Sequence, residues 1–343
     1  MRTWRWLIVG CGSIGRRHIA NLLAAGQQIV SVVDPDPDAL RRSGETFGLS
    51  GAAHLDEGLA ARPDVALIAS PTSEHLAAAI AAANAGCHLW IEKPLADRLD
   101  GLEALIALVQ ARGLVSVVGC NMRFHPGPRL AHDALEAGKI GRPLSARFEA
   151  GSYLPSWRPG TDFRRSYSAS AAQGGGCVLD GVHELDLACW MFGMPSEVMA
   201  MTAGGGALGT ETETVAEILL RYPEELLVSI HLDYVQRWRQ RRCEILGAEG
   251  TLSWESRRHE VAWYASQTDT STRLGYEPSY DINQMYVDEL HHVLRCLERQ
   301  ERSCADAAWG AQMTQLALAV KASARTGRAI PFDAPARVMT AST

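Results

Sequence analysis

The first 120 residues alternate between short runs that are apolar throughout and longer segments in which apolar side chains recur every three or four positions. A continuous apolar run is typical of a strand buried on both faces, and the longer spacing is typical of an amphipathic helix. The pattern predicts strands at residues 6–9, 29–33, 65–69, 88–91 and 114–118, separated by helices at 13–25, 38–47, 73–85 and 99–111. Strands joined by helices of this length form a parallel sheet. We therefore expect α/β architecture, with a doubly wound Rossmann domain at residues 1–121.

The pattern changes after Asn121. Helices are predicted at residues 125–137 and 178–192, with a strand at 143–153 between them. Closely spaced strands then follow at 197–202, 214–222, 226–234, 241–246, 251–254 and 260–264, and two helices at 281–298 and 306–326. Consecutive strands with short turns imply a largely antiparallel, open sheet. Residues 122–335 should therefore form an α+β domain for substrate binding and oligomerisation, with a polar loop at 267–280.

The composition narrows the class of protein. The 343 residues carry a net charge of −6, whereas a nucleic-acid-binding protein is usually basic. Runs of about 18 apolar residues, as a membrane span requires, are absent, and we expect no targeting segment. The eight cysteines form no CxxC pair and no zinc-finger spacing. We therefore expect a cytoplasmic protein with reduced thiols and no metal site, membrane or nucleic-acid partner.

A GxGxxG motif follows the first predicted strand and opens the first predicted helix. Gly10 would permit the tight turn, Gly12 the close approach of a pyrophosphate, and Gly15 close packing of the helix on the strand. Ser13 and Ile14 would lie at the helix N-terminus, which favours negative charge. A purely structural glycine turn is the alternative, but the strand–turn–helix context indicates a dinucleotide site.

Asp34 ends the second strand, 19 residues after Gly15. An acidic side chain there can accept hydrogen bonds from the adenosine ribose and would repel the extra phosphate of NADP, so NAD is the favoured cofactor. The alternative is an aspartate that only caps the turn before Pro35. Four arginines keep NADP open as the less favoured cofactor: Arg16, Arg17, Arg41 and Arg42.

Polar residues follow the third, fourth and fifth strands, where a doubly wound sheet binds its ligands. The candidates for cofactor binding are Ser70, Pro71, Thr72, His75, Glu92, Lys93 and Asn121, and Arg123 is a candidate for substrate binding. Lys93 leaves an apolar strand at the cofactor crevice. Partial desolvation there would lower its pKa towards the working range of an acid/base catalyst. A surface lysine near a turn is an equally simple interpretation.

A second polar cluster lies in the helix predicted at 178–192, directly after three glycines. Asp180, His183 and Asp186 are three residues apart and would share one helix face. A carboxylate beside an imidazole fixes its tautomer and raises its basicity. The alternative is a capped helix with a solvated acidic face.

Aromatic and basic residues lie between the two clusters. They are Tyr153, Trp157, Arg158, Arg164, Arg165 and Tyr167. Aromatic rings stack on sugar faces and arginines pair with carboxylate or phosphate, so we expect Tyr153, Trp157 and Arg165 to contact substrate. A loop that covers the other domain or another subunit is equally compatible.

The segments GCGSIGRRH, ASPTSEH, EKP and GGG…D…H…D, in this order and spacing, resemble the Gfo/Idh/MocA oxidoreductase family over essentially the whole chain. The resemblance implies hydride transfer between NAD(P) and a ring carbon of a sugar, sugar derivative or cyclitol. Lys93 matches the family's catalytic lysine, His183 its acid/base histidine and Asp180 the preceding aspartate, although D-x-x-x-H is the commoner spacing. The segments NMRFHPGPRL, GSYLPSWRPGTDFRRSYSA and LDGVHELD resemble a subgroup associated with nucleotide-sugar, sialic-acid-like and surface-polysaccharide pathways.

The resemblance also implies an oligomer, because the open sheet of the second domain often forms the interface in this family. We expect a homodimer or homotetramer, with residues 226–234 and 241–246 as candidate interface strands. Two other functions share the fold. One is an NAD-dependent glycosidase that acts by transient oxidation, and the other is a non-catalytic regulator that senses sugar or NAD.

Overall fold

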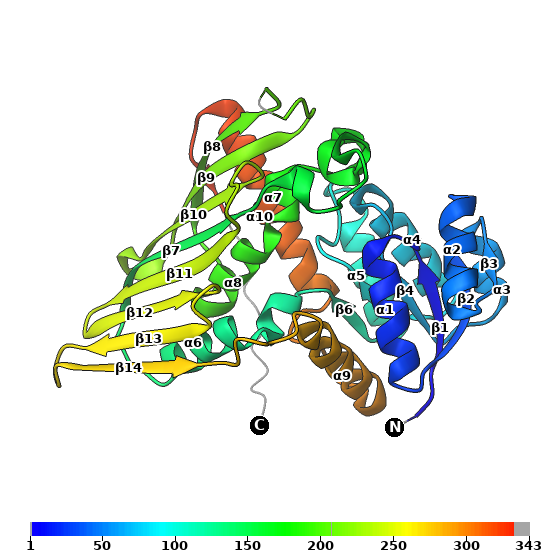
Figure 1. Ribbon diagram of the computed structural model, residues 1–343, viewed down its shortest axis with the longest axis horizontal. Helices are drawn as coiled ribbons and strands as arrows, with labels where there is room; N and C mark the ends of the chain where they lie inside the picture. The colour runs from blue at the N-terminus through cyan, green and yellow to red at the C-terminus, as the bar shows by residue number, and fades with distance from the viewer. Residues whose placement is uncertain (1, 207, 333–343) are drawn as a thin grey trace.

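The first domain is a six-stranded parallel sheet in the order β3-β2-β1-β4-β5-β6 (Figure 1). The computed structural model describes residues 2–206 and 208–332. The strands are β1 (Arg5–Val9), β2 (Gln28–Val33), β3 (Gly51–Ala52), β4 (Val65–Ile68), β5 (His88–Ile91) and β6 (Ser116–Val118). The helices are α1 (Ser13–Ala24), α2 (Pro37–Phe47), α3 (Leu55–Ala60), α4 (Thr72–Asn84) and α5 (Leu102–Ala111). The Rossmann architecture is thus confirmed, while β3 and α3 were too short for the pattern to show.

The second domain is a nine-stranded sheet in the order β14-β13-β12-β11-β7-β10-β9-β8-β15. The strands are β7 (Pro143–Gly151), β8 (Glu197–Gly204), β9 (Glu213–Arg221), β10 (Leu227–Asp233), β11 (Gln240–Gly247), β12 (Gly250–Glu255), β13 (Glu260–Ala265), β14 (Thr270–Gly275) and β15 (Ile330–Pro331). β7 and β10 pair in parallel, whereas the other neighbours pair antiparallel. The predicted open and largely antiparallel sheet is therefore confirmed.

Helices cover the face of this sheet that looks towards the first domain (Figure 1). They are α6 (Pro126–Glu136), α7 (Cys177–Asp180), α8 (Val182–Phe192) and α10 (Ala307–Thr326). Alternate strand residues such as Val198, Ile218 and Ile230 are buried beneath them. None of the helices in the described part of the chain is long and apolar enough to cross a membrane.

The prediction of one helix over residues 178–192 is wrong, because Gly181 interrupts it between α7 and α8. Gly181 packs against β10, and a Cβ atom there would lie 2.8 Å from the Leu232 side chain. The expected loop at 267–280 is also wrong in part, because β14 forms the sheet edge there. Its side chains are mostly exposed, which explains why they are polar.

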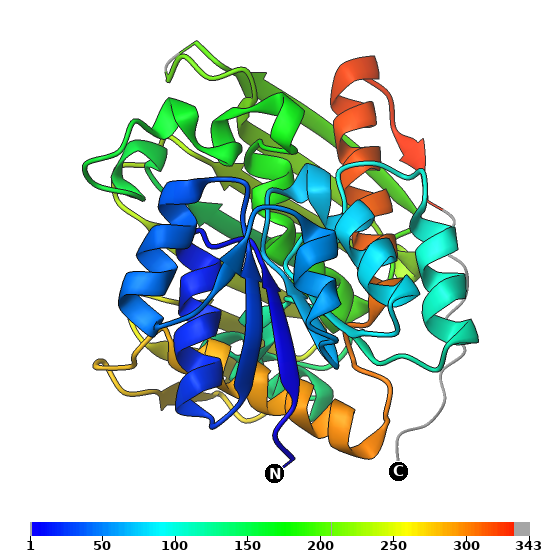
Figure 2. The same cartoon turned by 90° about the vertical axis from the view of Figure 1, so that its right-hand side faces the viewer.

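The last predicted helix but one, α9 (Gln284–Arg299), lies beside α1 of the first domain (Figure 2). Leu290 and Leu294 of α9 belong to the same buried cluster as Trp6 and Ile19. Side-chain amides of Asn21 and Asn283 also hydrogen-bond across this contact. The expected division at residue 121 therefore separates the two sheets, but α9 follows residue 121 and packs on the first domain. Residues 333–335 of the expected second domain lie outside the described residues.

Candidate active site

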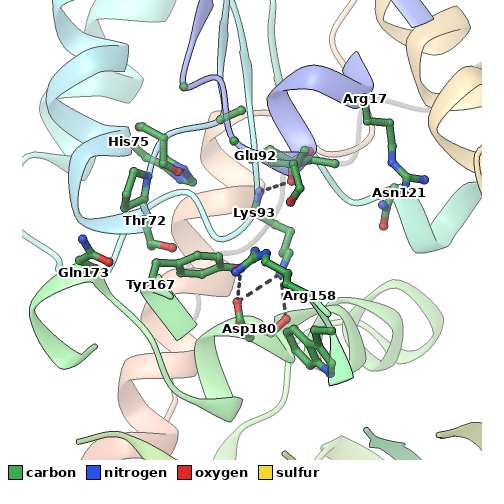
Figure 3. A pocket seen from close by; sticks show the side chains of 18 of the residues that line it. Arg17, Thr72, His75, Glu92, Lys93, Asn121, Arg158, Tyr167, Gln173 and Asp180 are labelled. Atoms are coloured by element: carbon green, nitrogen blue, oxygen red, sulfur yellow. Dashed lines mark hydrogen bonds and ion pairs between the residues drawn. The ribbon is translucent and has the colours of Figure 1, made fainter. Parts of the chain in front are cut away.

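A cavity of about 1550 Å³ lies between the two domains, at the carboxyl edge of the parallel sheet. Its walls include the loops after β1, β2, β4 and β5 on one side, and α7, α8 and the segment between β10 and β11 on the other. Figure 3 shows side chains of both domains pointing into this space. This is the place where open α/β sheets bind ligands.

The glycine motif has a geometry that suits a dinucleotide. Gly10 has a φ of 98°, and a Cβ atom on it would lie 2.5 Å from the carbonyl oxygen of Ala69. A Cβ atom on Gly15 would collide with the carbonyl oxygen of Gly10, so Gly15 serves helix packing and does not line the cavity. Gly12 has nothing within 4 Å of its Cβ position, so the cavity stays open there. Ser13 and Ile14 line the same wall.

Asp34 lines the cavity at the end of β2 and also holds the glycine loop. Its Oδ2 accepts a hydrogen bond of 2.7 Å from the backbone N–H of Cys11, and its Oδ1 accepts one of 2.9 Å from Asp36. Each carboxylate oxygen has a second lone pair, which leaves capacity for a ribose hydroxyl. Arg41 and Arg42, which could favour NADP, are both paired with carboxylates of α2 or its cap.

Glu92 and Lys93 follow β5 and both line the cavity. Glu92 Oε1 lies 2.7 Å from Nε2 of the buried His18, and Oε2 accepts from the backbone N–H of Lys93. Burial acts to raise the pKa of Glu92, but the hydrogen bond and charge of His18 and the charge of Lys93 outweigh it and hold the pKa below its ordinary value. Glu92 is therefore a carboxylate that orients the start of the EKP segment.

Lys93 contacts Asp180 across the domain boundary (Figure 3). Its Nζ donates a hydrogen bond of 2.9 Å to the main-chain oxygen of Asp180 and lies 3.7 Å from the carboxylate. That carboxylate also accepts hydrogen bonds of 2.6 Å from Tyr167 and 2.5 Å from Tyr234. The expected pairing of Asp180 with His183 is not found, since Gly181 breaks the shared helix face.

His183, at the start of α8, lines the same cavity as Lys93. Its Nδ1 is buried and has no hydrogen-bond partner among the described residues. Burial and the charges of Lys93 and Arg241 place the pKa of His183 well below 6.5. The imidazole is therefore neutral at neutral pH and has a nitrogen lone pair with which it can accept a proton.

Arg123 and Asp186 do not line the cavity and form a buried ion pair with each other. The Arg123 guanidinium donates hydrogen bonds of 2.9 and 2.6 Å to the two carboxylate oxygens of Asp186, to which the indole of Trp309 also donates. The side chains of the pair are 3% and 1% exposed. We therefore correct the expectation that Arg123 contacts substrate, and the acidic face of α8 is buried rather than solvated.

The other expected cofactor residues line the cavity, namely Ser70, Pro71, Thr72, His75 and Asn121. The two ring nitrogens of His75 each lie 2.8 Å from a carbonyl oxygen, one of Pro94 and one of Ser70. His75 thus connects the loops after β4 and β5. The expected substrate residues Tyr153, Trp157 and Arg165 also line the cavity, on its second-domain side.

Several lining residues carried no signal in the sequence. Tyr286 comes from α9 and reaches the cavity because α9 packs on the first domain; the Arg17 guanidinium lies 4.7 Å from its ring centroid. Arg237 and Arg239 come from the connection between β10 and β11, and Arg241 comes from the start of β11. The alternation of apolar and polar residues predicts β10 and β11 as strands, but it does not predict that the connection between them faces the cavity.

Comparison with known proteins agrees with this geometry. Residues 4–120 match the oxidoreductase family with an NAD-binding Rossmann fold, and residues 129–253 match the GFO/IDH/MocA C-terminal domain. The chain is 30% identical to the myo-inositol dehydrogenase Hyg17 of Streptomyces leeuwenhoekii over 258 residues, 71% of this chain and 74% of that one.

Levoglucosan dehydrogenase and the WlbA dehydrogenase are two of the solved structures with the same fold. Levoglucosan dehydrogenase in complex with NADH and L-sorbose has a TM-score of 0.86 at 21% identity, over 96% of this chain and 99% of that chain. The WlbA dehydrogenase from Bordetella pertussis, in complex with NADH and UDP-GlcNAcA, has a TM-score of 0.81 at 25% identity, over 97% and 100%.

The fold, the glycine loop and the cavity define a two-domain, NAD-dependent oxidoreductase. The chain belongs to the GFO/IDH/MocA family, and its first domain is the NAD-binding Rossmann domain of that family.

Proposed function

We propose that the protein oxidises a ring hydroxyl of a sugar, a sugar derivative or a cyclitol, with Lys93 and His183 as the catalytic pair. The observation that carries this proposal is that Lys93 from the first domain and His183 from the second line the same cavity as the glycine loop. NAD, when bound, supplies the acceptor for the hydride. The reverse reduction uses the same residues.

The two side chains suit different parts of the proton transfer. Neutral His183 accepts the hydroxyl proton as the carbon–oxygen bond becomes a carbonyl. The Lys93 amine hydrogen-bonds to the same oxygen and stabilises the negative charge that develops on it. Asp180 positions Lys93 through its main-chain oxygen and its carboxylate, so Asp180 is a positioning residue.

The relatives support a sugar-like substrate, since one is named for myo-inositol and another was solved with L-sorbose. A panel of sugars, cyclitols and nucleotide sugars, assayed for reduced cofactor with NAD and NADP in parallel, tests the proposal. We expect net NADH with at least one member and a preference for NAD. Glycoside cleavage without net NADH would point to transient oxidation, and NAD binding without any turnover would point to a sensor.

We also propose that the protein is a homodimer or homotetramer assembled through the uncovered face of the second sheet. Four apolar side chains are exposed there, on β8, β9 and β10: Met199, Met201, Leu219 and Leu227. Met199 and Leu219 are direct cross-strand partners, so their side chains lie next to each other on this face. These residues lie on β8, β9 and β10, and β10 falls within residues 226–234, one of the two candidate interface strands.

A cytoplasmic location stays a prediction. It is supported by the eight cysteines, all of which are free thiols in the structure.

A further inference from the structure

Arginines are concentrated on the second-domain side of the cavity. Four that line it form no ion pair with any carboxylate in the described chain: Arg158, Arg165, Arg237 and Arg239. The protein as a whole carries a net charge of −6, so this positive charge is a local feature of the cavity.

Asp180 and Asp233 of the same wall, and the buried Glu184 near it, already have partners. Asp180 is held by Lys93 and two tyrosines. Asp233 accepts hydrogen bonds from two backbone N–H groups and pairs with His231. Glu184 forms an ion pair of 2.7 Å with Arg241. None of these three carboxylates forms an ion pair with any of the four arginines. The charge of Glu184 acts to raise the pKa of Arg239, but burial and the charge of Arg241 outweigh it.

Aromatic rings hold two of these arginines in place. The guanidinium carbon of Arg237 lies 3.6 Å from the ring centroid of Tyr153, and that of Arg158 lies 5.7 Å from the ring centroid of Tyr167. A guanidinium stacked on a ring keeps its N–H groups free for an anion. Figure 3 shows Arg158 beside Tyr167.

The pKa of Arg239 shows that its charged form is destabilised in the cavity. Burial and the neighbouring charge of Arg241 lower the pKa of Arg239 from its ordinary value. An anion bound at this position would replace the lost hydration and relieve the repulsion between the two guanidinium groups.

We propose that these four arginines bind an oxyanion on the substrate, so that the enzyme acts on an acidic sugar rather than on a neutral sugar or cyclitol. The anion is a carboxylate on the sugar or a phosphate linked to it, and both would accept paired hydrogen bonds from arginine. This inference rests on the proposed function, because Lys93 and His183 must act on a hydroxyl of the same molecule. The glycine loop that suits the cofactor's pyrophosphate lies on the opposite domain.

Matched substrates test the proposal with the full-length protein and NAD. Glucose, glucuronate, glucose 6-phosphate, UDP-glucose and UDP-glucuronate differ in the presence and type of anion. We expect kcat/KM at least about tenfold higher for an anionic member than for glucose, because charge-assisted hydrogen bonds are lost with the neutral sugar. Comparison of glucuronate with glucose 6-phosphate and UDP-glucose shows whether the site binds a carboxylate or a phosphate. Equal kcat/KM for neutral and anionic sugars would overturn the inference and leave the proposed function standing.

Arginine variants locate the site. Arg237→Gln and Arg239→Gln should each raise KM for the anionic substrate by about tenfold or more, with kcat for it and the calorimetric Kd for NAD little changed. Arg257→Gln is the matched control, since Arg257 also stacks on an aromatic ring, that of Trp238, but does not line the cavity. Weakened NAD binding in the cavity variants would overturn the inference.

Calorimetry separates the inference from the proposed function. If the enzyme–NAD complex binds an acidic sugar, and Arg239→Gln weakens that binding, the anion site stands even when no sugar is oxidised. If no anionic sugar binds more tightly than glucose, the inference fails.

Discussion

The amine of Lys93 donates a hydrogen bond of 2.9 Å to the main-chain oxygen of Asp180, so a strand end of the first domain is connected directly to a helix end of the second. The contact uses a backbone atom, which no side-chain substitution at residue 180 removes. It also places the lysine at the boundary where a substrate must lie to meet both domains.

Replacing Lys93 should separate catalysis from cofactor binding. Lys93→Met removes the donor to the substrate oxygen, and we expect turnover to fall by about 10²-fold or more while NAD affinity changes little. Asp180→Asn should be milder, because the main-chain hydrogen bond to Lys93 persists. Steady-state kinetics and calorimetry measure the two effects. The control is Lys139→Met, at an exposed lysine outside the cavity; an unaltered turnover in Lys93→Met would remove Lys93 from the mechanism.

The pH dependence of kcat/KM should report His183. Its folded-state pKa lies well below 6.5, so the neutral base form is present above that pH and is lost as the pH falls through the lowered value. We expect the acidic limb of the profile below pH 6.5. His183→Ala should lower turnover by about 10²-fold and abolish this limb, and adding Lys93→Met should cost much less than the product of the two effects. An acidic limb centred above pH 6.5 would contradict this assignment.

Asp34 should set the choice of cofactor. Asp34→Ser removes the negative charge that repels the extra phosphate of NADP, and it also weakens the contact to the Cys11 N–H. The preference for NAD should narrow, as measured by kcat/KM for the two cofactors. A lower calorimetric Kd for NADP than for NAD with the wild-type protein would contradict the prediction.

Glu289 should make the protein less stable at high pH. Its side chain is fully buried, both carboxyl oxygens lack hydrogen-bond partners among the described residues, and burial together with the charge of Glu92 raises its pKa well above 4.5. A raised pKa means that its contribution to stability is complete at low pH and is lost as the pH rises through the folded-state value.

Glu289→Gln removes this ionisation. Between about pH 5 and about pH 9, the wild-type protein should lose more free energy of unfolding than the variant, by more than about 1.4 kcal/mol, the equivalent of one pKa unit. Urea unfolding at several pH values measures the difference. Parallel curves for the two proteins would show that Glu289 ionises alike in the folded and unfolded states over this range, so that its folded-state pKa is not raised.

A charge on the uncovered sheet face should weaken the oligomer. Leu219→Glu places a carboxylate beside Met199, and we expect light scattering to show a smaller species than the wild type. Leu99→Glu is the control, because Leu99 is 53% exposed but lies in the first domain. A monomeric wild-type protein at micromolar concentration would contradict the proposed assembly.

The sequence predicted most elements because their periodicity reflects burial, which is local to each strand or helix. His88–Ile91 was predicted with its observed bounds. The pairing of Asp180 with His183 failed because helical spacing assumes an uninterrupted helix, and the close packing of Gly181 on β10 breaks it. Tyr286 and Arg239 were missed because their positions depend on how distant elements pack.

The return of α9 to the first domain means that this domain is not one continuous stretch of chain. A fragment ending at residue 121 would lack α9 and leave part of the cluster around Trp6 and Ile19 open to water, so we expect it to aggregate. The backbone also crosses between the domains three times: before α6, before α9 and between α9 and α10. These three connections permit the cleft to widen and narrow but resist rotation about the line between the domains, which would keep Lys93 opposite α7 and α8 throughout turnover.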